Sequence, residues 1–501
     1  MTTPSADSIP SAASSPPGTQ RVLRPIRRRT SLAQSEYVGT FCLGLDLVCW
    51  LAAYSLMLWL RHHTLADRWA LGVDLRLSVC FVQFSVLAVC LFIVGGYDRR
   101  TNFVSLSYMS EHCIALVAAG VVGGLFIYAG ATYAQTLRPS RWVFLSSLAV
   151  FAPLSLGARR RLKVALQAEL ARSYFLVLGV GDKARHFHQS YLTSTNRESL
   201  RFVTPPVPAV GASGRSVGEN DDVTPGVEVA SLAELAAAAR ESNGIIIADG
   251  AHLLPPEWMD WLSRQHYEEV PVYTLETFYE RYWRRVPTYA IEPTWPIQVG
   301  SHLTNQSPYS HAKRLFDLFA AALGLLVLAP LLATLALFVW LESGRPVFFC
   351  QQRVGRDRRS FSLCKFRSMY VRPPGQEGSL YTGERDPRIT RVGGWLRKLR
   401  LDELPQLWNV FKGDMSLIGP RAEWDQLVER YDKLIPCYHF RHLVKPGITG
   451  WAQVNYPYGA SVQDAEQKLK YDLYYIRHYS LRLDAMICLK TLHIMLWGKG
   501  Q

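Results

Sequence analysis

Long apolar runs divide this chain into membrane and soluble parts. Four of them, at about 38–60, 75–97, 112–131 and 141–158, lie in the first third of the sequence. Each is long enough to cross the roughly 30 Å hydrocarbon layer of a bilayer as a helix. A fifth run, Leu315–Leu341, stands alone further along the chain. The pattern predicts a multi-pass membrane protein with a four-span helical bundle at 36–165.

Positive charge predicts how this bundle is oriented. Arginines are concentrated before the first run, in the loop with Arg99 and Arg100, and directly after the fourth run, and the alternate loops carry fewer. Because cytoplasmic loops are enriched in Lys and Arg, we expect both ends of the bundle to face the cytosol. Residues 1–35 are rich in Ser, Pro and Arg, which predicts a disordered cytosolic tail and not a signal peptide.

One acidic residue, Asp46, lies inside the first apolar run. Acids inside a membrane often belong to a functional site. An Asp that bonds to a polar partner between packed helices is an equally good interpretation. The sequence leaves both open.

Residues 172–300 have the composition of a soluble domain. Tyr174–Leu178 has the pattern of a buried strand, and so have Gly244–Asp249 and Val270–Leu275. Together with an Ala-rich helix that begins at a Ser231 capping box, they predict a small Rossmann-like α/β module. The turn Gly179–Ala184 has the form of a dinucleotide fingerprint with Ala in the third place. No clear ribose-binding acid follows, so a structural or regulatory role is favoured over nucleotide binding.

The isolated run 315–341 differs from the first four because both its flanks are strongly basic. Lys313 and Arg314 precede it, and several arginines follow Arg345. Positive charge at both ends predicts that both ends stay in the cytosol. Pro330 near the middle removes a helix hydrogen bond and favours a kink, so we expect a re-entrant helix hairpin. A kinked full span is the competing interpretation.

Composition narrows the class of protein. With 501 residues the chain has room for roughly three domains. The net charge of +14 suits an anionic membrane surface or phosphorylated substrates. No zinc-finger, helix-turn-helix or RNA-binding signature is present, so nucleic acid is not expected as a partner. Nine scattered cysteines without a CxxC pair favour a reducing cytosolic setting for the soluble parts.

An acidic pair among cations is the strongest sign of chemistry. Asp402 and Glu403 follow Arg397 closely, and a Gly-Pro-Arg turn supplies Arg421 further on. One carboxylate can attack phosphorus, the other can hold Mg²⁺, and the cations neutralise phosphate oxygens. A helix start with Pro405 in its first turn is the alternative. Further cations lie around this stretch: Lys365, Arg367, Arg388, Arg441 and Lys445. Some of them are expected to belong only to a solvated or lipid-facing surface.

The C-terminal stretch Lys468–Trp497 carries several tyrosines among basic residues. This character suits a helix that lies in the lipid headgroup region. A core helix of a soluble domain is an equally good interpretation.

Residues 311–499 resemble the bacterial sugar transferase family, the polyprenyl-phosphate hexose-1-phosphate transferases of the monotopic phosphoglycosyl transferase superfamily. The four spans and the α/β module resemble, by architecture, the long members that prime exopolysaccharide or O-antigen synthesis. Five blocks carry the resemblance, namely KRLFD (313–317), PVFFCQQRVGRDRRSFSLCKFRSM (346–369), DPRITRVGGWLRKLRLDELPQLWNVFKGDMSLIGPR (386–421), RHLVKPGITGWAQVN (441–455) and YDLYYI (471–476).

The resemblance implies a mixed α/β monotopic catalytic domain at 309–501. It makes Asp402 the nucleophile on a UDP-sugar and Glu403 the Mg²⁺ ligand. UMP would leave, and undecaprenyl phosphate would then take the phosphosugar. Glucose is the sugar expected from the resemblance to exopolysaccharide-priming members. The resemblance further implies that the substrate phosphates are bound by the cations Lys365, Arg367, Arg388, Arg397, Arg421, Arg441 and Lys445.

The resemblance also implies a location and partners. The catalytic domain would lie on the cytosolic face of the bacterial inner membrane, against anionic inner-leaflet lipids, and a homodimer is left open. The chain departs from the family pattern at Ala329, where Ser commonly precedes the proline, at Ala422, where a second Pro is usual, and at Arg400, where a small polar residue is usual. Two other functions are weighed: a membrane-anchored nucleotide-binding scaffold or sensor without transferase activity, and a redox enzyme that binds NAD at Gly179–Ala184.

Overall fold

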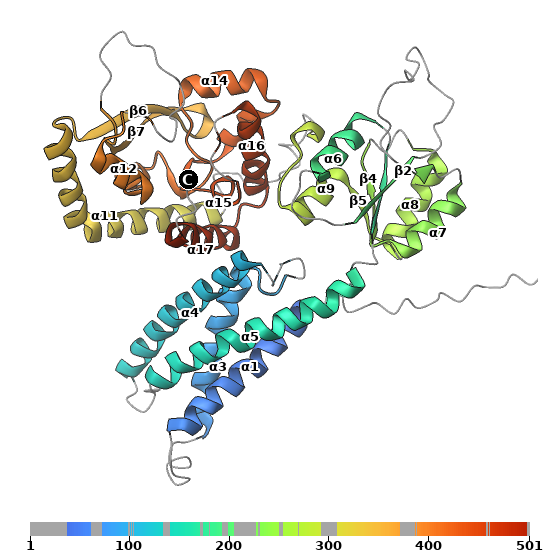
Figure 1. Ribbon diagram of the computed structural model, residues 1–501, viewed down its shortest axis with the longest axis horizontal. Helices are drawn as coiled ribbons and strands as arrows, with labels where there is room; N and C mark the ends of the chain where they lie inside the picture. The colour runs from blue at the N-terminus through green and yellow to red at the C-terminus, as the bar shows by residue number, and fades with distance from the viewer. Residues whose placement is uncertain are drawn as a thin grey trace, which may run out of the picture.

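Three parts make up the molecule in the computed structural model (Figure 1): a helical bundle, a part built on a parallel sheet, and a mixed part that runs from α11 to α17. The predicted tail at 1–35 lies outside the described residues. These are residues 38–61, 73–98, 101, 103, 105–133, 141–170, 174–179, 181–192, 199–204, 227–228, 231–249, 254–268, 270–291, 308–370, 386, 388–456, 459 and 461–497.

The bundle holds a helix at each of the four predicted segments. They are α1 (Val38–Arg61), α3 (Val73–Ile93), α4 (Leu106–Tyr133) and α5 (Arg141–Leu170). Trp50, Phe144 and Phe151 pack edge to face in its centre. Many large apolar side chains on the outer surface are exposed, as expected of helices whose solvent is lipid. Among the described residues, four helices are long and apolar enough to cross a membrane: α1, Tyr108–Ala129 of α4, Trp142–Ala165 of α5, and α11.

Asp46 forms an ion pair with Arg159 that joins α1 to α5. Ser155 also donates a hydrogen bond to the Asp46 carboxylate, at 2.7 Å. Arg159 donates a further hydrogen bond to the carbonyl oxygen of Gly96. Because these side chains are buried and mutually bonded, the second interpretation of Asp46, a partner-bonded acid between packed helices, is the one that the structure matches.

The second part is a five-stranded parallel sheet with the order β3-β2-β1-β4-β5. Its strands are β1 (Phe175–Leu178), β2 (Leu200–Thr204), β3 (Val227–Glu228), β4 (Gly244–Ile247) and β5 (Val272–Thr274). Strands β1, β4 and β5 coincide with the three predicted strands. The loop between β2 and β3, at 205–226, lies outside the described residues.

Helices cover both faces of this sheet (Figure 1). They are α6 (Asp182–Leu192), α7 (Leu232–Glu241), α8 (Pro256–Glu268) and the short α9 (Leu275–Phe278). Successive side chains of a strand point to opposite faces, so Val177 packs with Phe187 of α6 while Leu176 packs with Leu235 of α7. The predicted cap is confirmed, because Ser231 Oγ accepts a hydrogen bond from the Glu234 N–H at 3.3 Å.

The third part begins with α11 (Pro308–Ser343), a helix of 36 residues that contains Pro330 and bends sharply in Figure 1. Near its start, Lys313 pairs with Asp484 at 2.5 Å. Near its end, Glu342 accepts hydrogen bonds from the main-chain N–H groups of Arg391 and Val392, at 2.7 and 2.9 Å. Both ends of the helix are therefore held by the same domain, while most apolar side chains between them are exposed.

Two small sheets lie near α11. Strands β6 (Phe348–Val354) and β7 (Ser360–Phe366) form an antiparallel hairpin, and β8 (Ser416–Ile418) pairs in parallel with β9 (Gly447–Thr449). Between them lie α12 (Arg391–Lys398), the 3-10 turn η7 (Leu401–Glu403) and α13 (Gln406–Lys412). A Cβ on Gly447 would lie 2.1 Å from the Gly419 nitrogen, so only glycine allows β8 and β9 to approach this closely.

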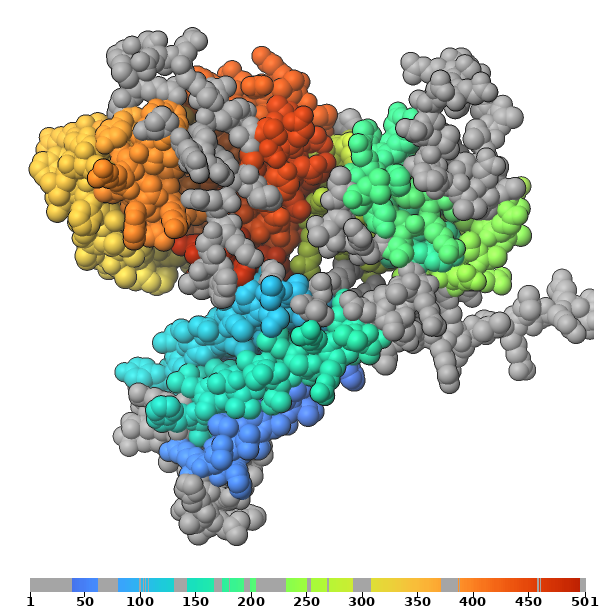
Figure 2. All heavy atoms as spheres, viewed as in Figure 1, coloured from blue at the N-terminus to red at the C-terminus, as the bar shows by residue number. Residues whose placement is uncertain are grey.

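The remaining helices close this domain and join it to the others. They are α14 (Asp425–Leu434), η8 (Tyr438–Leu443), α15 (Trp451–Asn455), α16 (Val462–Arg477) and α17 (Leu481–Trp497). Tyr475 of α16 is fully buried in the core, so α16 is the core helix of the second interpretation and not a headgroup helix. Helix α17 lies against the end of the bundle (Figures 1 and 2), where Lys490 pairs with Glu111 of α4 at 3.5 Å.

The sheet part meets the third part through the turns η3 (Tyr279–Trp283) and η4 (Thr288–Ala290). Glu280 of η3 pairs with Arg477 of α16 at 2.9 Å. Arg284 pairs with Asp98 at the end of the bundle at 2.6 Å, and its carbonyl oxygen accepts a hydrogen bond from the Trp451 indole. All three parts therefore contact one another around Arg284.

Candidate active site

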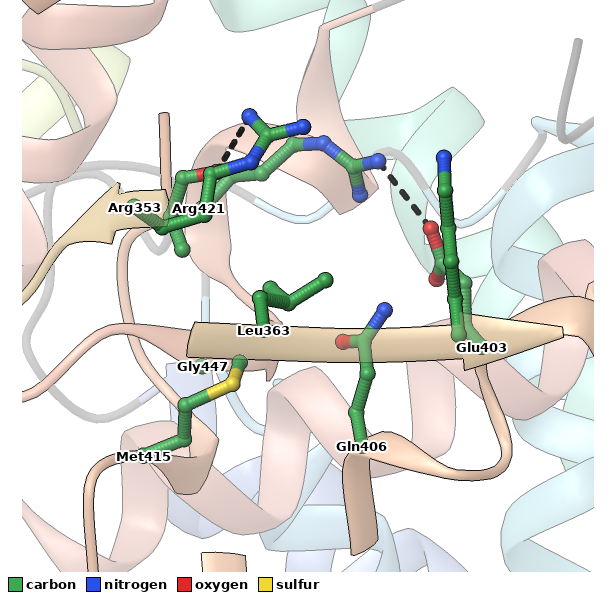
Figure 3. Close-up of a pocket in the computed structure, with 9 residues that line it drawn as sticks. Arg353, Leu363, Glu403, Gln406, Met415, Arg421 and Gly447 are labelled. Atoms are coloured by element: carbon green, nitrogen blue, oxygen red, sulfur yellow. Dashed lines mark hydrogen bonds and ion pairs between the residues drawn. The ribbon is translucent and has the colours of Figure 1, made fainter. Parts of the chain in front are cut away.

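A pocket in the third part collects acidic and basic side chains from elements far apart in the sequence (Figure 3). The hairpin, η7, α13, the loops that flank β8 and the start of β9 all contribute to it. Figure 3 shows Arg421 reaching toward Glu403 on one side and the Gln406 amide pointing inward from α13. The lining residues are Arg353, Leu363, Lys365, Glu403, Gln406, Met415, Arg421, Ala422 and Gly447.

The hairpin directs one of its faces toward this pocket. Arg353 lies opposite Phe361, and Phe349 opposite Lys365, so Arg353, Leu363 and Lys365 share one face of the two strands. This alternation explains how cations twelve residues apart in the sequence reach the same pocket. Lys365 Nζ also lies 5.4 Å from the centre of the Phe349 ring, a cation–π contact.

The acidic pair is held on the 3-10 turn η7, just after α12. Arg400 ends the preceding segment in the left-handed region, with φ of 54°, and this reverses the chain before Leu401. Asp402 is buried, with only 8% of its surface exposed. Burial and the neighbouring charge of Glu403 raise the pKa of Asp402, and the cations Lys365, Arg397 and Arg421 limit the increase. Asp402 lies beside the pocket, next to Glu403 in the chain, but it is not one of the residues that line the pocket.

Glu403 lines the pocket directly. Arg421 Nη2 donates a hydrogen bond to Glu403 Oε1 at 3.0 Å. Burial alone would raise the pKa of Glu403, but the charges of Arg421 and Arg400 and this hydrogen bond outweigh it and lower the pKa. The two adjacent carboxyls therefore have pKa values shifted in opposite directions, a feature typical of paired catalytic acids.

Lys365 has a lowered pKa, because it is partly buried and faces the positive charges of Arg353 and Arg421. Asp402 and Glu403 partly offset that effect. Burial and Arg421 likewise lower the pKa of Arg353, although Glu423 opposes the shift. Cations forced together in this way favour an anionic ligand, because phosphate oxygens would relieve their mutual repulsion.

Arg441 is a predicted phosphate-binding residue that does not line the pocket. It is buried, pairs with Asp472 at 2.9 Å and donates a hydrogen bond to the Tyr438 hydroxyl at 2.6 Å. A third hydrogen bond runs from Arg441 Nη2 to the main-chain carbonyl oxygen of Arg421, at 3.0 Å. The geometry thus gives Arg441 an indirect role, in which it fixes the position of Arg421.

Four other predicted cations also lie outside the lining of this pocket. Arg367 donates hydrogen bonds to Ser343 and to the carbonyl oxygen of Gly344. It thereby provides donors for carbonyl oxygens at the C-terminal end of α11 that lack a partner within the helix. Arg388 pairs with Asp386, two residues before it in the sequence. Lys445 is half-buried, and burial lowers its pKa. Arg397 approaches Met369 Sδ at 3.8 Å and contributes to the site through its charge near Asp402.

Several residues that complete the pocket were not among the predicted site residues: Arg353, Leu363, Gln406, Met415, Ala422 and Gly447. Gln406 belongs to the same DELPQ block as the acids, so its position in the motif was a usable signal. Arg353 is one of the arginines that follow Arg345, and its place in the pocket depends on the strand pairing of the hairpin, which the sequence does not show. Met415 and Leu363 are apolar and carried no chemical signal.

The residues present fit a Mg²⁺ ion that is shared with a substrate. Mg²⁺ in phosphoryl-transfer sites is usually bound by one or two carboxylates together with substrate phosphates. Glu403 supplies one ionised carboxylate in the pocket. Across the described part of the chain, no group of three or more His, Cys, Asp or Glu residues forms a complete metal cage. A site that needs phosphate oxygens to complete the coordination is consistent with both observations.

Comparison with known proteins gives the family. The model of the bacterial sugar transferase family matches residues 308–498. The exopolysaccharide production protein PSS of Rhizobium leguminosarum bv. phaseoli is 41% identical over 194 residues, which cover 38% of this chain and 97% of that protein. The chain therefore belongs to the bacterial sugar transferase family.

Two longer relatives match over part of their length. A UDP-N-acetylgalactosamine-undecaprenyl-phosphate N-acetylgalactosaminephosphotransferase of Aeromonas hydrophila is 43% identical over 247 residues, 49% of this chain and 57% of that protein. An undecaprenyl-phosphate glucose phosphotransferase of Komagataeibacter xylinus is 46% identical over 185 residues, 36% of this chain and 35% of that protein. The alignments thus span only about a third to just over half of these two relatives.

Proposed function

We propose that this protein is a polyprenyl-phosphate glycosyl-1-phosphate transferase that moves a hexose-1-phosphate from a UDP-sugar to undecaprenyl phosphate. The observation that carries the proposal is the pocket itself, where Glu403 and Arg421 are bonded beside a buried Asp402 and the cation Lys365. The names of the family relatives supply the substrate classes: undecaprenyl phosphate in several, with a UDP-sugar donor.

In the first step an Asp402 carboxylate oxygen attacks the phosphorus that bears the sugar. The bond from that phosphorus to the bridging oxygen breaks, UMP leaves with both bonding electrons, and the phosphosugar stays on Asp402 as a mixed anhydride. Lys365, Arg353 and Arg421 surround the pocket and stabilise the charge on the phosphate oxygens. Burial raises the pKa of Asp402 and removes it from water, which makes its ionised form a stronger nucleophile.

In the second step a phosphate oxygen of the lipid attacks the same phosphorus, and the Asp402 carboxylate leaves. The product is a lipid-linked diphosphosugar, and Asp402 returns to its starting form. A covalent intermediate lets a soluble donor and a lipid acceptor use one site in turn. Glu403 would hold Mg²⁺, which supplies further charge neutralisation at the phosphates when bound.

The membrane arrangement follows from the same domain. Helix α11 would enter the inner leaflet, bend at Pro330 and return, because both its ends contact the catalytic domain and the apolar side chains between them are exposed. The active site would then lie at the cytosolic face of the bacterial inner membrane, among anionic lipids. The parallel-sheet part would be a Rossmann-like module with a structural or regulatory role, and a homodimer stays open.

The sugar is the finer part of this proposal. Glucose is the first candidate, because five of the relatives are named for glucose transfer. N-Acetylgalactosamine is the second, because the relative with the long 247-residue match is named for it. The product of either transfer would start an exopolysaccharide, O-antigen or capsule repeat.

Release of UMP from a panel of UDP-sugars, with undecaprenyl phosphate present or absent, tests the proposal. Asp402→Asn should abolish both UMP release and lipid product, and wild-type protein given donor alone should carry a phosphosugar on the peptide with Asp402. Asp357→Asn, on the exposed hairpin turn, is the matched control and should keep full activity. Retained turnover in Asp402→Asn would refute the covalent mechanism, and the absence of transfer from every UDP-sugar would refute the function.

A further inference from the structure

Two cysteines face each other across the hairpin that carries the pocket cations. Cys350 of β6 lies directly opposite Cys364 of β7, and their Sγ atoms are 2.6 Å apart. Both are free thiols, Cys350 is exposed and Cys364 is partly exposed. No step of the proposed transfer uses either one.

The hydrogen bonds of β7 show which kind of cross-strand pair this is. The Cys364 N–H donates to the Asn409 side-chain oxygen at 3.2 Å, and the Ser362 carbonyl oxygen accepts from the Asn409 amide at 2.8 Å. Main-chain groups at these positions therefore face α13 and not β6. In an antiparallel pair such residues form a non-hydrogen-bonded pair, with Cα atoms about 4.5 Å apart. This separation lies within the range of roughly 4.4–6.8 Å that a disulfide requires.

We propose that Cys350 and Cys364 are a reversible oxidation site, at which a cross-strand disulfide forms on the back of the active-site hairpin. The oxidant is a small-molecule disulfide. The Cys350 thiolate attacks one of its sulfurs and one thiol leaves. The Cys364 thiolate then attacks Cys350 Sγ in the mixed disulfide, and the second thiol leaves. Two protein thiols are oxidised and the reagent is reduced to two thiols, so atoms and electrons balance.

The two thiols have different parts in this exchange. Cys350 is exposed and meets the reagent first. Burial, together with the neighbouring Cys350 thiol, raises the pKa of Cys364 to about 11, although Ser362 and Lys412 oppose the shift. Since the thiolate is the attacking form, Cys364 reacts slowly with free reagent and is suited to the second step, where its target is held beside it.

The bond would act on the active site through the hairpin. The cysteines occupy one face of the strands, and Arg353, Leu363 and Lys365 occupy the other, where they line the pocket. A covalent link between the strands at 350 and 364 fixes their separation directly beside Lys365. Displacement of a catalytic group by about 1 Å can lower a rate on the order of 100-fold. We expect oxidation to lower transfer roughly 10- to 100-fold, and this readout alone rests on the proposed function.

Disulfide mapping tests the site independently of activity. The full-length protein, folded in detergent or nanodiscs, is treated with oxidised glutathione, alkylated and digested without reductant. We expect one cross-linked peptide pair that joins Cys350 to Cys364 and disappears with dithiothreitol. Cys350→Ser and Cys364→Ser should each prevent it, while Cys488→Ser, which removes an exposed thiol of α17, should not. Glutathione retained on Cys350 without the bridge would overturn the proposal.

The rate of UMP release completes the experiment. Treatment should slow the wild type and the Cys488→Ser variant, and dithiothreitol should restore both. The Cys350→Ser/Cys364→Ser double variant should be as active as reduced wild type and insensitive to the treatment. If the disulfide forms in full and the rate does not change, the link between the hairpin and the active site is wrong. If no variant transfers sugar but the bridge still forms, the proposed function fails and the oxidation site stands.

Discussion

Arg441 Nη2 lies 3.0 Å from the main-chain carbonyl oxygen of Arg421, to which it donates a hydrogen bond. The same nitrogen pairs with Asp472 at 2.9 Å. Arg421 in turn reaches Glu403 in the pocket at 3.0 Å. A buried ion pair is thus connected to the acidic pair through a single residue, and Arg441 can affect catalysis without contact with substrate.

Arg441→Met should destabilise the protein by about 3–5 kcal/mol, because it leaves the buried Asp472 carboxylate without its partner. Unfolding in denaturant measures the change. Arg441→Met/Asp472→Leu should recover most of that stability but not the activity, because the carbonyl of Arg421 still lacks its donor. In the double variant we expect a higher KM for the UDP-sugar. Equal losses of stability in the single and double variants would contradict this account.

The pH dependence of transfer should report the raised pKa of Asp402. In the proposed mechanism the carboxylate is the reactive form, so the rate should fall as pH decreases through that pKa, above the ordinary value of 3.8. Lys365 limits the increase of this pKa, so Lys365→Gln should move the acidic limb of the rate profile to higher pH. Lys365→Arg keeps the charge and should leave the limb in place, as should Lys412→Gln at an exposed position on α13. A limb in Lys365→Gln at the wild-type pH would count against Asp402 as the titrating group.

Much of the helical architecture could be predicted because its signals are local. Four apolar runs, an N-cap at Ser231 and three buried strand patterns each depend on neighbouring residues, and the structure contains each of these elements. The acidic pair was likewise visible as Asp402 and Glu403 in one motif. In the structure Glu403 lines the pocket, while Asp402, one residue before it on η7, is outside the lining.

The roles of the cations could not be predicted because they depend on distant partners. Lys365 and Arg421 line the pocket. Arg441 instead forms an ion pair with Asp472, and Arg367 donates hydrogen bonds at the C-terminal end of α11. In the sequence all four are equivalent positive charges in similar motifs. The packing of α16 and α11 against the domain determines the role of each cation. It decides which cations face the pocket and which ones pair with a buried acid or with the carbonyl oxygens at a helix end.

The topology of α11 gives a third prediction. Ala312 precedes its apolar stretch and Arg345 follows it, and both are exposed. In protein whose native cysteines are replaced by Ser, a cysteine placed at either position should react with a membrane-impermeant maleimide in inverted vesicles and not in intact spheroplasts. Both ends should behave alike, because Lys313 and Glu342 bind the same domain. A cysteine in the segment 134–140, which the charge pattern predicts on the periplasmic side, provides the control with the opposite pattern. Labelling of 312 and 345 from opposite sides would refute the re-entrant helix.

The position of the Asp249 carboxylate indicates that the parallel-sheet part does not bind a dinucleotide. Asp249 follows β4, and its Oδ2 accepts a hydrogen bond from the Gly181 N–H at 2.7 Å, in the turn that resembles a dinucleotide fingerprint. In nucleotide-binding turns such N–H groups bind the phosphate oxygens of the nucleotide. Here the Asp249 carboxylate occupies the position of the phosphate, and its negative charge would repel a phosphate group. A Cβ on Gly179 would lie 2.6 Å from the same carboxylate, which leaves little space between them.

We therefore expect no heat of binding when NAD is titrated into wild-type protein, and this outcome would exclude the redox alternative. Asp249→Ala removes both the charge and a hydrogen bond to a charged acceptor, and should destabilise this part by about 1.5–3 kcal/mol. Asp249→Asn keeps a hydrogen-bond acceptor of the same size and should cost less. Glu257→Gln, which neutralises an exposed acid on α8 of the same part, is the matched control and should change neither stability nor binding. If wild-type protein and Asp249→Ala bind NAD equally tightly, the Asp249 carboxylate does not block the turn. The parallel-sheet part would then have to be regarded as a nucleotide-binding site.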